Sequence, residues 1–229
     1  MVNFRVVLLI QIFLAGYIIA QPTISYEYHG GDTIRVISRK YSNGGVDITR
    51  TKNGELHGKS EGFYPNGSKM NETFFIDGKE HGVRKGWSEN GFQSVYKPYH
   101  YGVPVDTHKV WYHNENKKTQ EVYDSSGQRH GWAMNWYENG TLQDSTLYEK
   151  GEKLEEYHFY ECGALLFTSK MRPDGYIVSS ESFTTDGKRN GQVKDGNGFV
   201  VMPGRGETLD TLTIEDGRVV DDSFHFFRP

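Results

Sequence analysis

The chain has 229 residues, among them 27 glycines, 15 tyrosines, 13 phenylalanines, 4 tryptophans and a single cysteine. One cysteine excludes a disulfide framework within the chain, and the abundance of aromatic side chains argues against intrinsic disorder. The 26 basic and 30 acidic residues give a formal net charge of -4, so the charge balance gives no electrostatic reason to expect nucleic acid or an anionic lipid surface as partner.

Residues 1–20 have the pattern of a targeting segment. Arg5 is followed by an apolar run from Val6 to Ala20. As a helix this run would be about 22 Å long, which is shorter than the roughly 30 Å hydrocarbon core of a bilayer. We therefore predict a signal peptide over residues 1–20, cleaved after Ala20, and an exported protein that is periplasmic, outer-envelope-associated or extracellular. An uncleaved N-terminal anchor is the alternative, and it is the only membrane contact that we expect.

Residues 21–53 precede the regular part of the chain and show one sign of the same organisation. Tyr41-Ser42-Asn43-Gly44 has the composition of a tight turn. We therefore expect N-terminal strands or a degenerate repeat over residues 21–53.

Residues 54–191 form the regular part of the chain. Aromatic side chains recur there at steps of 24, 24, 25, 23 and 24 residues, and this first aromatic row consists of Phe63, Trp87, Trp111, Trp136, Phe159 and Phe183. A second row of turns carries glycines at the same interval, namely Gly78, Gly102, Gly127, Gly151 and Gly175. Fixed periods of this length are typical of proteins that stack copies of one supersecondary unit, so we expect both rows to have structural roles.

The turn residues indicate that the repeated unit is a β-hairpin. Asn66-Gly67 and Asp77-Gly78 exemplify pairs that favour the positive φ angles of tight hairpin turns. A turn about every twelve residues leaves roughly 6 to 9 residues for each strand, and aliphatic residues are too sparse for a thick core. We predict an all-β fold, an elongated single-layer antiparallel meander of about seven or eight β-hairpin repeats of about 24 residues.

Residues 192–229 lose the regular spacing, and we expect a degenerate C-terminal repeat or cap there. Asp195-Gly196-Asn197-Gly198 begins like a calcium-binding loop. However, Phe199 occupies the third ligand position, and no glutamate follows at the required distance. We interpret this stretch as a turn.

Tyrosines follow most members of the first aromatic row, and they are candidate binding residues: Tyr64, Tyr112, Tyr137 and Tyr160. Successive strand residues point to opposite faces, so the first row should pack while the tyrosine row faces a partner. Tyrosine suits a partner surface because it is large, stiff and half polar. The alternative is that both rows stack to stabilise a thin sheet.

No residue pattern predicts catalysis, a metal or a cofactor. His57, His81 and His130 share a repeat position, but hairpins one repeat apart separate equivalent residues by about 9.6 Å, which is too far for two histidines on one zinc. Cys162 replaces a turn asparagine, and Ser126 and His130 lie in a turn with no partnered carboxylate. We expect structural roles for these residues and a protein without enzymatic activity.

The unit Asp77-Gly78-Lys79-Glu80-His81-Gly82, followed by Trp87 and Glu89-Asn90-Gly91, resembles MORN-type repeats. It is similar to the variant found in bacterial proteins of the YwqK-family antitoxins, and the resemblance extends from about Gly54 to Gly191. The resemblance implies a hairpin-repeat sheet that binds other molecules and has no catalytic residues.

Three functions remain open. The leading expectation is an exported, non-enzymatic repeat protein that acts as a protein-binding or cell-envelope-binding scaffold, because repeat arrays offer extended surfaces. The first alternative is an antitoxin or immunity-type partner that binds and neutralises a toxin, and the second is a lipid-binding module, which the acidic charge balance disfavours. The repeat fold does not identify the ligand.

Overall fold

The computed structural model describes residues 21–203 and 209–220, which form 21 β-strands and no helix. None of the described residues therefore contributes a helix that could span a membrane. The chain divides into two compact units, Met1–Glu115 (unit 1) and Asn116–Pro229 (unit 2), and each is described by itself. The predicted signal segment, residues 1–20, lies outside the described residues.

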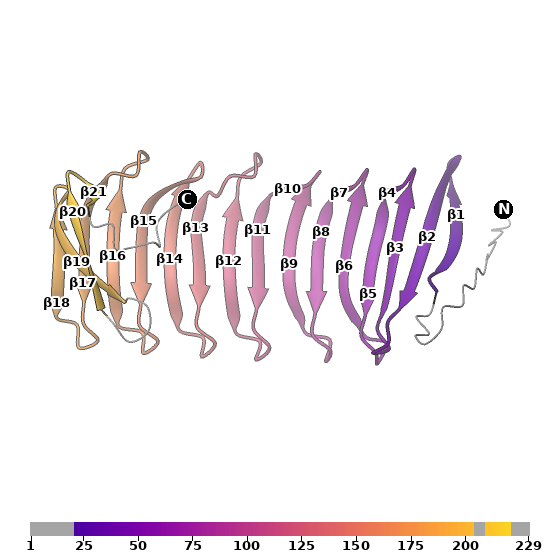
Figure 1. Cartoon of the computed structure of the whole chain (residues 1–229), viewed down its shortest axis with the longest axis horizontal. Helices are drawn as coiled ribbons and strands as arrows, with labels where there is room; N and C mark the ends of the chain where they lie inside the picture. Colours follow the sequence, from indigo (N-terminus) through magenta and orange to yellow (C-terminus); the bar gives the residue numbers. More distant parts are fainter. Residues whose placement is uncertain (1–20, 204–208, 221–229) are drawn as a thin grey trace, which may run out of the picture. The chain divides into compact units, whose positions relative to one another are not determined.

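Unit 1 is an antiparallel meander in which strands that follow one another in sequence lie side by side (Figure 1). Its strands are β1 (Thr23–His29), β2 (Asp32–Lys40), β3 (Val46–Lys52), β4 (Glu55–Leu56), β5 (Gly58–Phe63), β6 (Lys69–Ile76), β7 (Lys79–Glu80), β8 (Gly82–Trp87), β9 (Gln93–His100), β10 (Val103–Pro104) and β11 (Asp106–Trp111). The short strands β4, β7 and β10 each begin a returning strand that continues, after one bulge, as β5, β8 and β11.

Unit 2 continues the same pattern of antiparallel pairs between consecutive strands. Its strands are β12 (Lys117–Tyr123), β13 (Gly131–Trp136), β14 (Leu142–Glu149), β15 (Glu152–Phe159), β16 (Leu165–Met171), β17 (Ile177–Phe183), β18 (Arg189–Lys194), β19 (Asn197–Pro203), β20 (Leu209–Glu215) and β21 (Arg218–Val219). The predicted all-β class and the antiparallel meander of hairpins are confirmed in both units.

The turns after the first aromatic row share one hydrogen-bond pattern. The Tyr64 N–H donates to the Ser68 carbonyl, and the Gly67 N–H donates to the Tyr64 carbonyl, both at 2.9 Å. The side-chain Oδ1 of Asn66 accepts the Ser68 N–H at 2.8 Å, while Gly67 has a φ of 84°. This is a type I turn followed by a left-handed glycine. Asparagine therefore acts here through its side chain, and glycine alone supplies the positive φ angle.

The turns of the second row are mostly of a different type. Asp77 and Gly78 have φ angles of 48° and 77°, and two consecutive left-handed residues define a type I′ turn. The same pair of positive angles occurs at Asn53-Gly54, Tyr101-Gly102, Lys150-Gly151, Asp195-Gly196 and Asp216-Gly217. In the turns at Gly127 and Gly175 only the glycine is left-handed. Glycine is thus left-handed in both rows, and the turn types differ in the conformation of the residue before it.

Glycines of the second row also connect successive repeats. The Gly78 N–H donates to the Leu56 carbonyl, and the Gly102 N–H donates to the Glu80 carbonyl, both at 2.7 Å. Gly151 makes the equivalent bond in unit 2, at 2.9 Å. Each bond joins a turn to the preceding repeat.

The C-terminal strands of unit 2 depart from the predicted single layer. Here side chains of β19 and β20 pack against those of β16, and β19 also contacts β17, with which it does not pair. We call β16–β21 the C-terminal roll. Its apolar core consists of Leu166, Phe167, Val193, Val200, Leu212 and Ile214. These side chains are 1% to 8% exposed, whereas both aromatic rows are only half-buried. Two packed layers exclude water from apolar side chains far better than one layer does.

Small residues permit the close approach of the two layers of the C-terminal roll. Ser182 is 0% exposed, and its Oγ accepts the Val201 N–H at 3.0 Å. A Cβ atom added at Gly191 would lie 2.7 Å from the Val200 Cα. Any larger residue at this glycine would therefore push β19 away from β18, the strand with which it pairs.

Hydrogen bonds between turns close the C-terminal roll. The Ile177 N–H donates to the Gly217 carbonyl at 2.9 Å, Gly217 donates to Gly196 at 2.7 Å, and Gly196 donates to Val178 at 3.1 Å. The ring of Tyr176 covers this junction, because a Cβ atom added at Gly217 would lie 2.3 Å from it. Three segments that are distant in sequence are thus tied together at one point.

Candidate binding sites

The tyrosines that we predicted to bind a partner are half-buried. Three of their hydroxyls donate to a carbonyl of the next repeat, Tyr64 to Trp87 at 2.8 Å, Tyr137 to Phe159 at 2.9 Å and Tyr160 to Phe183 at 2.9 Å. Burial raises the pKa of Tyr137 and of Tyr160. These hydroxyls join neighbouring repeats, which supports the alternative in which both rows stabilise the sheet. Binding of a partner by Tyr64, Tyr112, Tyr137 and Tyr160 stays a prediction.

The first aromatic row is placed much like the tyrosine row. Its members are half-buried as well, and lysine ammonium groups lie over two of the rings. Lys69 Nζ is 5.7 Å from the Trp87 ring centroid, and Lys117 Nζ is 5.3 Å from that of Trp136. Such contacts are cation–π interactions. The degree of burial therefore does not distinguish the first aromatic row, which we predicted to pack, from the tyrosine row, which we predicted to bind a partner.

The three histidines of the shared repeat position occupy a backbone bulge. Each donates its N–H to the strand before the turn, at 2.8 Å to 2.9 Å, and each is followed by a glycine with positive φ. His57 Nδ1 also lies 3.1 Å from Asp77 Oδ1 in the next turn. Over residues 21–203 and 209–220, no group of three or more His, Cys, Asp or Glu side chains is placed to hold a metal ion. The histidine position thus has a local role in the repeat.

The turn between β9 and β10 holds a cluster of aromatic rings. The Tyr101 ring centroid lies 4.6 Å from that of His81 and 4.8 Å from that of His100, and the two histidine rings are 5.1 Å apart. Tyr101 is 48% exposed. The Nδ1 atom of His81 is buried and has no hydrogen-bond partner in the described part of the chain. We call these three residues the Tyr101 cluster.

Tyr101 stands at a position where its backbone conformation is unfavourable. Its φ is 48°, and the left-handed region costs a non-glycine residue about 1–2 kcal/mol. Equivalent turns place Asn53 or Asp77 there, and Asn and Asp tolerate this region better. An aromatic ring is therefore held at the surface in a turn that would be more stable with a small polar residue.

Two further apolar residues with exposed side chains lie on strands that adjoin the Tyr101 cluster. Val103 begins the strand after the turn and is 37% exposed. Phe74 is 43% exposed, and its carbonyl accepts the His81 N–H at 2.8 Å. Tyrosine and phenylalanine are among the residues that are enriched at protein interfaces.

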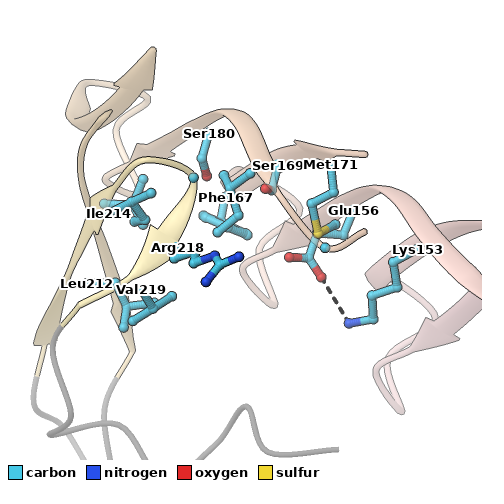
Figure 2. A pocket seen from close by; sticks show the side chains of 14 residues that line it. Lys153, Glu156, Phe167, Ser169, Met171, Ser180, Leu212, Ile214, Arg218 and Val219 are labelled. Atoms are coloured by element: carbon cyan, nitrogen blue, oxygen red, sulfur yellow. Dashed lines mark hydrogen bonds and ion pairs between the residues drawn. The ribbon is translucent and has the colours of Figure 1, made fainter. Parts of the chain in front are cut away.

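A second candidate site is a pocket of about 320 Å³ inside the C-terminal roll. Figure 2 shows Leu212, Ile214 and Val219 on one side of it and Phe167, Ser169 and Ser180 on the other, with Arg218 between them. Glu156 lies toward the far end, next to Lys153. The sequence did not predict any closed concave site, because the pocket exists only where the sheet folds over itself.

Glu156 is the acidic group of this pocket. It is 6% exposed, and its Oε2 lies 3.4 Å from Lys153 Nζ and 3.6 Å from His158 Nε2. Burial would by itself raise the pKa of Glu156, but the hydrogen bond from His158 and the charge of Lys153 outweigh burial and hold the pKa below its ordinary value. The carboxylate is therefore ionised and already paired.

Sequence reasoning could have found one of these two sites. Tyr101 precedes a turn glycine of the second row, where Asp77 and Lys150 are polar, so an aromatic residue there is a visible exception. For Glu156 and Arg218 the sequence offers no comparable signal. Comparison with known proteins adds nothing to either site, since no family model and no curated protein matches this chain.

Proposed function

We propose that this chain is an exported, non-enzymatic repeat protein that binds another protein through the Tyr101 cluster. The observation that carries the proposal is the exposure of Tyr101 in a left-handed turn. Strained residues persist where the surrounding structure fixes them, and they are concentrated at functional sites. Tyrosine is also among the residues that dominate the binding energy of protein interfaces.

The hairpin repeats support this proposal by acting as a scaffold. The Gly102 N–H ties the turn of Tyr101 to Glu80 in the preceding repeat at 2.7 Å, and His81 and His100 contact its ring. The ring is thus held in place before any partner arrives, so little conformational entropy is lost on binding.

The ionisation of Glu156, the buried carboxylate on β15 that lines the pocket, also agrees with binding rather than catalysis. A general base works best when its pKa lies near the operating pH, whereas the pKa of Glu156 is held below its ordinary value by His158 and Lys153, against the effect of burial. The acidic group of this pocket is therefore unsuited to proton transfer near neutral pH.

The test is site-specific crosslinking with the mature protein, residues 21–229. A photoreactive phenylalanine analogue replaces Tyr101 in one variant and Tyr28, which is 58% exposed, in a control. We expect one defined partner protein to crosslink from position 101 and not from position 28. Equal crosslinking from both positions, or none from position 101 in envelope and culture-medium extracts, would show that the cluster is not an interface.

A substitution separates binding from stability. Tyr101→Asn introduces the residue found in the turn at Asn53, so relief of backbone strain and loss of ring contacts should roughly cancel, leaving the free energy of unfolding within about 1 kcal/mol of the wild type. We expect this variant to lose the crosslinked partner in a pull-down while it melts normally. A variant that melts normally and keeps the partner contradicts the proposal.

A further inference from the structure

The pocket of the C-terminal roll has the dimensions and walls of a small-molecule site. Its volume of about 320 Å³ lies within the range of ~300–1,000 Å³ seen for ligand pockets. The walls are largely apolar, with Phe167, Ile177, Leu212 and Ile214 among the lining residues. Such a surface can cover a compact hydrocarbon or aromatic body.

The charged groups of the pocket are not balanced. Glu156 is already paired with Lys153 and His158. Arg218 lines the same pocket, and it has no ion-pair partner among residues 21–203 and 209–220. The uncompensated charge at the pocket is therefore positive. In Figure 2 the Arg218 side chain lies between the two apolar walls.

We propose that this pocket binds a small carboxylic acid with an apolar body. The body would lie against Phe167, Leu212 and Ile214, and the carboxylate would accept hydrogen bonds from the Arg218 guanidinium. Arginine is well suited to this contact because its planar fork matches a carboxylate with two parallel bonds. The site lies in unit 2, whereas the proposed protein-binding cluster lies in unit 1, so neither proposal depends on the other.

The structure argues against two other ligand classes. A cationic ligand would be repelled by Arg218, which has no ion-pair partner among the described residues, while Glu156 is already paired with Lys153. A phospholipid with two acyl chains is too large for a volume of about 320 Å³. A single short apolar body with an anionic end fits both the size and the charge.

Three probes with one apolar body test the proposal on the full-length mature protein. Octanoate, 1-octanol and octylammonium are titrated by calorimetry below their aggregation concentrations. We expect octanoate to bind at least about tenfold more tightly than the other two, which is the size of effect that one charge-assisted hydrogen bond gives. No binding of any probe, or binding of octylammonium at least as tight as that of octanoate, would overturn the proposal.

Variants and methyl spectra locate the binding. Arg218→Gln should weaken octanoate binding about tenfold and leave 1-octanol unchanged. Arg189→Gln is the matched control, because Arg189 is an arginine of unit 2 that pairs with Glu181 and does not line the pocket. Octanoate should shift the methyl signals of Ile177 and Ile214 but not that of Ile48 in unit 1. Equal losses in the two arginine variants, or shifts confined to Ile48, would place the ligand elsewhere.

Discussion

At the scale of single residues, Tyr137 shows how one hydroxyl can connect two repeats. Its side chain crosses to the next repeat and donates to the Phe159 carbonyl at 2.9 Å. The hydroxyl of Tyr137 therefore links two repeats, a role that could not be read from the position of this residue before a turn. Tyr64 and Tyr160 perform the same task at their own repeats.

We expect Tyr137→Phe to lower the free energy of unfolding by about 0.5–1.5 kcal/mol, because the Phe159 carbonyl loses its donor while the ring stays in place. Chemical denaturation followed by tryptophan fluorescence measures the change. Tyr157→Phe is the control, since the Tyr157 hydroxyl donates to Glu155 on its own strand. An equal loss in both variants would mean that the hydroxyl of Tyr137 does not join repeats.

Glu156 should make the stability of unit 2 depend on pH. Its pKa is held below the ordinary value of 4.5, because the hydrogen bond from His158 and the charge of Lys153 outweigh burial. A carboxyl group whose pKa is lowered by folding stabilises the folded state at pH values above its unfolded pKa, and this contribution is lost as the pH falls through the folded pKa.

We therefore expect Glu156→Gln to be less stable than the wild type at neutral pH, with the difference shrinking as the pH falls below about 4.5. Melting temperatures measured from pH 7 to pH 3 give the two curves. Glu149→Gln, at an exposed position on β14, should run parallel to the wild type throughout. A constant difference for Glu156→Gln at every pH would contradict the ionised pair.

At the scale of secondary-structure elements, the closure of the C-terminal roll depends on turn glycines. Gly217 receives a hydrogen bond from Ile177 and donates one to Gly196, and the Tyr176 ring leaves no room for a side chain there. Gly187 also has a positive φ, 80° against 68° for Gly217, but nothing lies within 4 Å of its Cβ position. The two glycines thus differ mainly in the space around them.

This difference gives a matched pair of variants. Gly187→Ala should cost about 1 kcal/mol from the left-handed backbone alone, whereas Gly217→Ala should cost about 2–4 kcal/mol because overpacking against Tyr176 is added. Urea denaturation of both variants provides the comparison. Equal costs would show that the junction under Tyr176 does not hold the C-terminal roll closed.

At the scale of the whole molecule, export is a proposal that rests on residues 1–20. Mass spectrometry of envelope and secreted fractions should find a mature N-terminus at or near Gln21, because the apolar run ends at Ala20. Expression of the chain with its native N-terminus is sufficient for the measurement. Intact chain starting at Met1 in the soluble cytoplasm would exclude export.

The elongated shape is likewise still a prediction, and it rests on the repeat period. A compact protein of the same mature length would have a radius of gyration of about 17 Å, whereas strands paired in series at about 4.8 Å intervals extend much further in the pairing direction. Small-angle scattering of the monomeric mature chain should return a clearly larger radius. A radius near the compact value would contradict an extended meander.

The sequence by itself determined the hairpin unit, its period and the all-β class. These features are local, since Gly67 and Gly78 lie within the turns whose positive φ angles they supply, and a turn fixes the pairing of the two strands beside it. Even here the exact role of Asn66 was decided by its hydrogen bond to Ser68.

Only the tertiary structure decided the C-terminal roll, its pocket and the surroundings of Tyr101. Gly217 must lie under the ring of Tyr176, and no periodicity expresses a contact between positions so far apart in the chain. Arg218 likewise reaches the pocket of Glu156 only because β21 follows the fold-back of β20. The hairpin repeats depend on residues that are close together in sequence. The pocket, in contrast, forms where the C-terminal strands depart from the repeat pattern and pack against earlier strands.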